Sequence, residues 1–227
     1  MQYAMLQAYW PRHSRDLLIH TIELHMARND MRPCSREEAE RTVALVPNSS
    51  GWAVYDDCAD RMDLSAMDGL GRALTRRLEK SGASGTVALG VVVSEDKRLL
   101  RLYAGGRVRD TLLLSPHPVA RPATFTDTLR ARRWRPLLGK REERAAMAKL
   151  LLACGGASPA EICGLLHLDG SSRYGFRSLE LEQPEGMIWL PFRSETTVKQ
   201  KLSERILNVV QQPGSAAGAC LRRRDPH

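Results

Sequence analysis

Hydrophobic residues in the first half of the chain follow two spacings, one typical of helices and one typical of strands. Two stretches, 16–29 and 63–80, carry apolar residues every three to four positions and are predicted to be helices. Short apolar runs bounded by turn residues predict strands at 3–9, 40–46, 52–56, 87–93, 99–103 and 108–114. The predicted order is therefore strand, helix, strand, strand, helix and three further strands.

The clearest helix signal follows Asp63, a residue type that favours the N-cap position. The apolar residues after it fall on one helical face. They are Leu64, Met67, Leu70, Leu74 and Leu78. Basic residues crowd the predicted last turn, where the helix dipole favours positive charge. Asp63 is thus expected to begin a helix that buries one side.

The first six predicted elements have the order of a ferredoxin-like split β-α-β unit, β-α-β-β-α-β. Such a unit places two helices on one face of an antiparallel sheet. The last two strands, 99–103 and 108–114, flank a glycine turn and are expected to add a β-hairpin. The fold class predicted for this half is therefore α+β, with an antiparallel sheet.

The second half is predicted to be mainly helical. Amphipathic stretches and cap signals indicate helices at 141–154, 158–166, 171–181 and 195–211. Prolines between the two halves favour a linker. We therefore expect a sheet domain at 1–116, a proline- and arginine-rich linker at 117–139, a helical region at 140–212 and a disordered basic tail at 213–227.

Charge is distributed unevenly along the 227 residues, whose 34 Lys and Arg exceed 26 Asp and Glu. Residues 1–120 are nearly neutral, whereas 121–227 hold most of the excess. The densest basic cluster comprises Arg130, Arg132, Arg133, Arg135, Lys140, Arg141 and Arg144. Such a cluster can track phosphates, or it can be a solvated linker beside an acidic neighbour.

The helices predicted within 143–181 have the order of a degenerate helix-turn-helix. In that interpretation Arg173 and Arg177 would face the major groove, and Met187–Phe192 would form a wing. Gly175 lies in the middle of the predicted recognition helix, where it costs about 1 kcal/mol relative to alanine. The alternative is a helical appendage that packs on the sheet.

Three aspartates form a D-D-x-x-D string, Asp56, Asp57 and Asp60. Several carboxylate oxygens at this spacing are suited to Mg²⁺. The string follows a predicted strand instead of lining a helix, so cap and turn carboxylates are the alternative. A magnesium-dependent enzyme would use these three residues.

Other features narrow the function classes. The chain contains no apolar run of about 18 residues, which predicts no contact with a membrane interior. Its start lacks the pattern of a secretory signal, and its five cysteines contain no C-x-x-C pair, so we expect a cytoplasmic protein with reduced thiols. No nucleophile or phosphate-loop motif occurs, and we expect no cofactor.

The segment Gly51-Trp52-Ala53-Val54-Tyr55-Asp56-Asp57, with the helix after it and the Val87–Val93 run, resembles a group of uncharacterised bacterial proteins. These proteins carry a Gly-Trp…Val-Tyr-Asp segment before a comparable helix. The resemblance covers about residues 40–120. It implies kinship but no particular activity.

Three functions follow from these observations. The first is a non-catalytic regulatory or protein-interaction module, favoured by the missing catalytic motifs, whose partner would be another protein. The second is nucleic-acid binding through the basic cluster. The third is the magnesium-dependent enzyme.

Overall fold

The structure is a computed structural model of the chain. The structure describes residues 3–9, 15–61, 63–80, 87–93, 98–114, 125–138, 140–152, 159–168, 175–200 and 202–203. Parts of several predicted features, including the proline-rich residues 115–124 and the whole predicted tail 213–227, lie outside these ranges.

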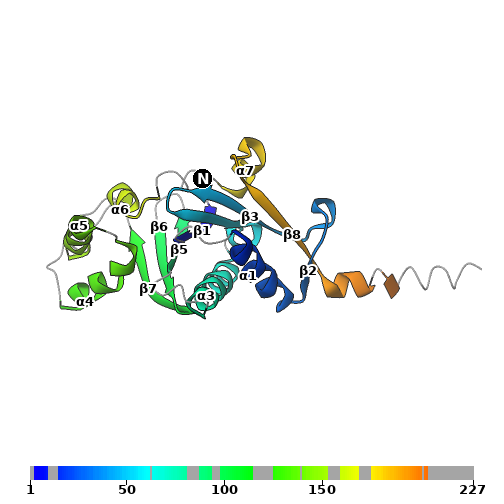
Figure 1. Cartoon of the computed structure of the whole chain (residues 1–227), viewed down its shortest axis with the longest axis horizontal. Coiled ribbons are helices and arrows are strands. Elements are labelled where there is room, and N and C mark those ends of the chain that lie inside the picture. The colour runs from blue at the N-terminus through cyan, green and yellow to red at the C-terminus, as the bar shows by residue number, and fades with distance from the viewer. Residues whose placement is uncertain are drawn as a thin grey trace, which may run out of the picture.

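Eight antiparallel strands among the described residues form one sheet (Figure 1). They are β1 Tyr3–Tyr9, β2 Met31–Pro33, β3 Arg41–Asn48, β4 Gly51–Asp56, β5 Val87–Val93, β6 Arg98–Ala104, β7 Arg107–Leu114 and β8 Ile188–Ser194. Their order across the sheet is β2-β8-β3-β4-β1-β5-β6-β7. The α+β class and the antiparallel sheet are confirmed. The whole order differs from a four-stranded ferredoxin-like sheet, because β2 and β8 extend one side and β6 and β7 the other.

The helices of the described residues connect and cover these strands. They are α1 Arg15–Ala27, α2 Asp57–Asp60, α3 Leu64–Lys80, α4 Phe125–Arg133, α5 Arg141–Leu152, α6 Pro159–Leu165 and α7 Phe176–Glu182, with single 3₁₀ turns η1 Arg36–Glu38 and η2 Arg135–Leu137. The chain is helical again at 195–200 and 202–203. None of the described helices is long and apolar enough to cross a bilayer.

Helices α1 and α3 pack side by side on one face of the sheet. Leu18, Ile22 and Met26 of α1 are fully buried there together with Met67 and Leu70 of α3. The predicted cap is confirmed, since an oxygen of Asp63 accepts hydrogen bonds from the backbone of Ser65 at 3.0 Å and of Ala66 at 3.2 Å. The periodic apolar stripes thus face the sheet.

Helix α3 lies unusually close to the strands beneath it. A methyl group added at Gly71 would stand 2.9 Å from the ring of Tyr103 on β6, a residue with no exposed surface. Gly90 on β5 leaves the same ring and Met67 room at 3.1 Å. Two glycines, one on the helix and one on the sheet, therefore allow Tyr103 to fill the layer between them.

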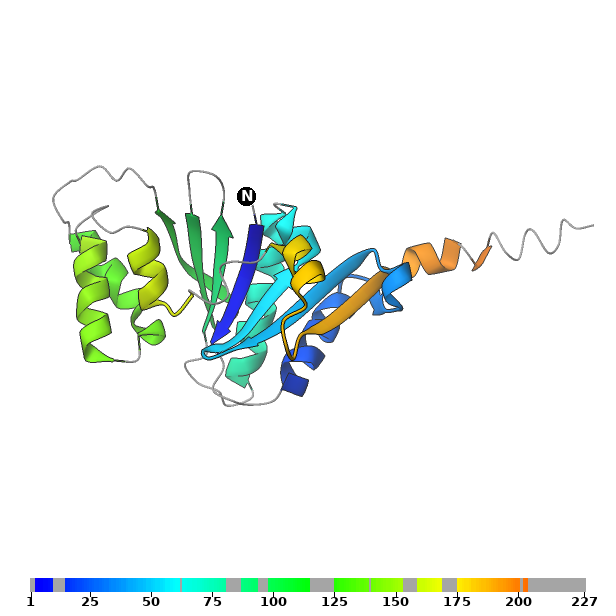
Figure 2. The same cartoon turned by 90° about the horizontal axis from the view of Figure 1, so that it is seen from above.

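The opposite face of the sheet is covered by the second half of the chain. Trp134 is completely buried there, and Met147, Ile162 and Leu179 join it from α5, α6 and α7. Figure 2 shows α4, α5 and α6 gathered beside β6 and β7. Both faces of the central strands are therefore buried, which explains why β5 is an almost continuous apolar run.

Strand β8 corrects the interpretation of Met187–Phe192 as a wing. The segment Ile188–Ser194 pairs with β3 on one side, where Phe192 lies opposite Arg41, and with β2 on the other. A strand that is hydrogen-bonded on both sides has no free edge to offer to DNA. The segment therefore belongs to the sheet begun by the first half of the chain, and its Phe192 is buried there.

Candidate nucleic-acid interface

The predicted basic cluster lies on α4, η2 and α5, with Lys140 just before α5, but Arg130 differs from its neighbours. Its Nε donates to Oδ2 of Asp110 on β7 at 2.9 Å, and its Nη2 bonds to the carbonyl oxygen of Thr111. The indole N–H of Trp134 donates to the same Asp110 oxygen at 2.7 Å. Because Asp110 is 8% exposed, this arrangement anchors α4 to the sheet. Arg130 is therefore a packing residue.

A β-bulge brings Asp110 beneath α4. In the pairing of β6 with β7, Leu102 lies opposite Asp110 and Tyr103 lies opposite Val108, so Arg109 is the extra residue. Strict alternation would turn positions 107 and 110 to opposite faces of the sheet. With one residue inserted, Arg107 and Asp110 both face the layer of α4 and α5.

The first groove lies between the β6–β7 hairpin and α4 and has a volume of about 690 Å³. Its basic residues are Arg107, Arg109, Arg132 and Arg133, and its remaining lining is Leu102, Ala104, Val108 and Pro136. All four arginines are exposed. Arg133 lies 4.0 Å from Asp110, an oxygen of which is already bonded to Arg130 and Trp134.

The second groove lies between α4 and α5 and has a volume of about 510 Å³. Arg132, Arg135, Arg141 and Arg144 line it above a base of small residues, Ala131, Ala145 and Ala148. Arg132 belongs to both grooves. Among the described lining residues of the two grooves there is no carboxylate.

We call the seven arginines of the two grooves the arginine face: Arg107, Arg109, Arg132, Arg133, Arg135, Arg141 and Arg144. Five of them belong to the cluster predicted from the sequence. Arg107 and Arg109 were missed because they lie on a strand in the nearly neutral half. Their alternating pattern after Gly105-Gly106 was the available signal, since it marks a basic hairpin end beside the linker.

The remaining predicted basic residues do not join these grooves. Lys140 is exposed just before α5, where its backbone N–H donates to Glu143 at 3.3 Å. Arg177 is exposed on α7, which begins after Gly175, so this glycine is an N-cap and does not weaken a helix interior. Arg173 lies outside the described residues, as do 169–174 generally. The helix-turn-helix stays a prediction.

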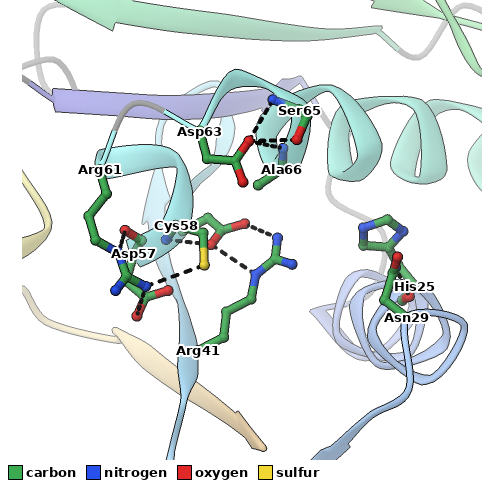
Figure 3. Close-up of polar contacts among 10 residues, drawn as sticks. His25, Asn29, Arg41, Asp57, Cys58, Arg61, Asp63, Ser65 and Ala66 are labelled. Carbon is green, nitrogen blue, oxygen red and sulfur yellow. Dashed lines mark hydrogen bonds and ion pairs between the residues drawn. The ribbon is translucent and has the colours of Figure 1, made fainter. Parts of the chain in front are cut away.

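The predicted aspartate site has a different character (Figure 3). Asp56 is 3% exposed and forms a two-pronged ion pair with Arg41 of β3, in which Nε lies 3.1 Å from Oδ1 and Nη2 contacts Oδ2. The same Oδ1 accepts the backbone N–H of Cys58 at 3.0 Å, which caps α2. Both oxygens of Asp56 are thus occupied by protein donors.

Only two of the three predicted magnesium ligands come together. Potential ligand atoms of Asp56, Asp57 and Cys58 lie within 4.8 Å of one another, and Asp60 is not part of this group. Burial raises the pKa of the Asp57 carboxyl, of the Cys58 thiol and of the Asp60 carboxyl. A metal would have to displace the Arg41 guanidinium from Asp56, so the cluster has the chemistry of a capped turn.

Asp57 and Asp60 each interact with residues outside α2. Asp57 pairs with Arg61 at 3.3 Å, and the backbone of Thr42 opposes the rise of its pKa. The backbone N–H groups of Phe176 and Ala4 act in the same way on Asp60. One oxygen of each carboxylate is buried without a hydrogen-bond partner among the described residues. These acids connect α2 to surrounding backbone.

Comparison with known proteins gives no independent guide. No family model, no curated protein and no solved structure matches the chain. The resemblance over residues 40–120 accordingly stays a prediction.

Proposed function

We propose that this protein is a non-catalytic module that binds the phosphate backbone of double-stranded nucleic acid through the arginine face. One observation carries the proposal. Two adjoining grooves share Arg132, are lined by seven exposed arginines and contain no described carboxylate. Guanidinium groups bind phosphate through paired hydrogen bonds as well as charge.

Asp110 neutralises little of the arginine face, which favours this proposal over an internally neutralised linker. Asp110 binds Arg130 at 2.9 Å and stands 4.0 Å from Arg133, and the arginine face forms no other ion pair with the described residues. Seven cations gathered on one surface repel one another. A polyanion removes that repulsion and releases its own counterions when it binds.

The lining of the grooves indicates how the duplex is held. No aromatic side chain is among their described lining residues, and Trp134 is fully buried with its N–H bonded to Asp110. Base stacking, which single-strand binding proteins use, has no platform there. Contacts to phosphates without sequence readout are therefore the proposed mode.

Two finer features belong to this proposal. The inner strand order β3-β4-β1-β5, with α1 and α3 on one face, supports the predicted split β-α-β core. A cytoplasmic location gives access to nucleic acid, and Cys34 and Cys58, which form no disulfide, would stay reduced there.

The first test measures binding of a fluorescein-labelled mixed-sequence duplex by anisotropy. If four to seven phosphates are contacted, the association constant falls by about 10² to 10⁴ between about 50 and 200 mM salt. A polyglutamate chain of similar length serves as a competitor, because an acidic protein partner would present carboxylates instead. Absence of duplex binding at the lower salt concentration overturns the proposal.

Variants then assign the surface. Arg132→Gln with Arg135→Gln is expected to weaken binding and to reduce the salt slope by about 2, since each lost phosphate contact removes about 1. The matched control is Arg15→Gln with Arg177→Gln, two exposed residues outside both grooves. Equal weakening by the control would show that the arginine face is not the binding surface.

A further inference from the structure

A third groove lies on the opposite face of the sheet, between α1 and α3. Its volume is about 270 Å³. It is lined by His25, Arg28, Gly69, Arg72, Ala73, Arg76, Arg77 and Lys80. Figure 1 shows α1 and α3 lying next to each other, far from α4 and α5. We call this the α1–α3 groove.

The cations of the α1–α3 groove are almost without internal compensation. Asp68 is 3.9 Å from Arg72, but its Oδ1 binds Arg101 at 2.7 Å and the hydroxyl of Tyr103 at 2.6 Å. Arg28, Arg76, Arg77 and Lys80 form no ion pair with the described residues. Glu79 is turned away from the groove, toward Gly105 in the β6–β7 turn.

The helix dipole of α3 favours only some of these basic residues. Arg77 and Lys80 occupy the last turn, where cations are favourable. Arg72 and Arg76 lie deeper in the helix, and Arg72, Arg76 and Lys80 follow one another at intervals of four residues. Like charges at this spacing are about 6 Å apart and destabilise a helix. A row of this kind is suited to an anion that spans more than one charge.

The base of the groove is built around His25. Its imidazole is half-buried and packs on Gly69, where an added methyl group would stand 3.2 Å from Cε1. Burial, then the charge of Arg41, lowers the pKa of His25 and so favours the neutral ring, whose two nitrogens can donate and accept hydrogen bonds. Arg76 is held at the other end, because its side chain packs over Gly106.

We propose that the α1–α3 groove binds a small molecule carrying at least two linked phosphate groups, independently of the arginine face. The volume is close to the lower limit for small-molecule sites, and the groove is recessed between two helices. Arg72 and Lys80 are about 12 Å apart along the helix axis, a distance greater than one phosphate covers. Arg28, in the turn after α1, and three arginines of α3 line that space.

The test uses inorganic pyrophosphate as the probe, with orthophosphate for comparison, in calorimetric titrations of the full chain. Pyrophosphate is expected to bind more tightly than orthophosphate. Ala73→Glu places a carboxylate in the groove and should remove this binding, whereas Ala73→Gln, of nearly the same shape, should retain most of it. Arg77→Gln with Lys80→Gln is a second variant. Both positions are exposed, so the fold should stay intact while pyrophosphate binding weakens.

The His25 imidazole resonance provides a local signal, assigned with His25→Gln. It should move when pyrophosphate is added to the native chain and stay fixed in Ala73→Glu. Arg132→Gln with Arg135→Gln should leave pyrophosphate binding within a factor of about two, because these residues lie on the other face. No pyrophosphate binding, or binding equally strong in Ala73→Glu, overturns the inference.

A duplex titration separates this inference from the proposed function. Ala73→Glu should bind duplex as the native chain does. If it instead weakens duplex binding as strongly as the arginine-face variant, the α1–α3 groove is part of the nucleic-acid surface and the small-ligand inference is wrong. If only duplex binding fails in the native chain, the inference about the α1–α3 groove still stands.

Discussion

On each face of the sheet one aspartate joins a helical segment to a strand, but the aspartate comes from the helix on one face and from the strand on the other. On the α1–α3 face the acid belongs to the helix, and Asp68 receives Arg101 and Tyr103 from β6. On the other face the acid belongs to the sheet, and Asp110 receives Arg130 and Trp134 from the α4 region. The same pair of donors, a guanidinium and an aromatic O–H or N–H, completes each contact.

The packing of α3 and the packing of α4 on the sheet depend on these polar contacts to different degrees. Helix α3 is 17 residues long and also buries an apolar stripe, so Asp68 adds to an interface that shape already specifies. Helix α4 has nine residues, three of them arginines in its last turn, and its docking depends on Asp110 and Trp134. Once one arginine is bound, the others project into solvent as the arginine face.

The largest expected effect is that of Asp110→Ala. It leaves the Trp134 N–H buried and Arg130 without its acid, which should lower the free energy of unfolding by about 3 kcal/mol. Urea unfolding measures the loss. Asp68→Ala should cost less, about 1–2 kcal/mol, because Asp68 is 23% exposed whereas Asp110 is 8% exposed. Equal losses would contradict the contrast between the faces.

Gly71→Ala tests whether shape dominates the α1–α3 face. The new methyl group would meet the Tyr103 ring at 2.9 Å, and the ring cannot move without giving up its bond to Asp68. We expect a loss of about 1–3 kcal/mol despite the better helix propensity of alanine. Gly69→Ala is the matched control, since it meets the more adaptable His25 at 3.2 Å. Its loss should be clearly smaller in the same urea experiment.

The sequence was sufficient where elements are defined locally. Asp63 and the apolar spacing after it predict α3, and the glycine turn at 105–106 predicts the hairpin of β6 and β7. Strand β8 could not be predicted as part of the sheet. Its pattern is local, but its partner β3 lies about 150 residues earlier, and pairing over that distance is decided by the complete core.

The candidate site shows the same limit. The basic cluster was visible as composition, yet Arg130 looks identical in sequence to Arg132 and only the fold shows that Asp110 binds it. The bulge at Arg109 adds two arginines that the cluster did not include. In the α1–α3 groove, Arg28 lies in the turn after α1 and Arg76 lies on α3, and nothing local links them.

Tyr103 gives a titration test of the α1–α3 face. Burial first, and then its hydrogen bond to Asp68, raises the pKa of Tyr103 well above the usual value of about 10. The unfolded chain releases this proton above about pH 10 while the folded chain keeps it, so this contribution to stability is complete below that pH and is lost as the pH rises. Absorbance of tyrosinate from about pH 8 to 11 should therefore match in the native chain and Tyr103→Phe. A larger increase in the native chain would contradict this burial.

The smallest effects, of opposite sign, are expected from two aspartates three residues apart. Burial raises the pKa of Asp60, near Ala4 and Phe176, whereas bonds from Ser65, then Ala66, lower that of Asp63 at the cap of α3. A raised pKa means that folding favours the protonated acid, so Asp60→Asn should stabilise the chain by less than about 1 kcal/mol near pH 7. That gain should shrink as the pH falls toward about 4, where the native acid takes up its proton.

Asp63→Asn should instead weaken the chain near pH 7, because the ionised cap is the favoured form, and the loss should fade below about pH 4. Urea midpoints of both variants, measured near pH 7 and again below about pH 4, test this contrast. If both substitutions change stability in the same direction, Asp60 is not a desolvated acid.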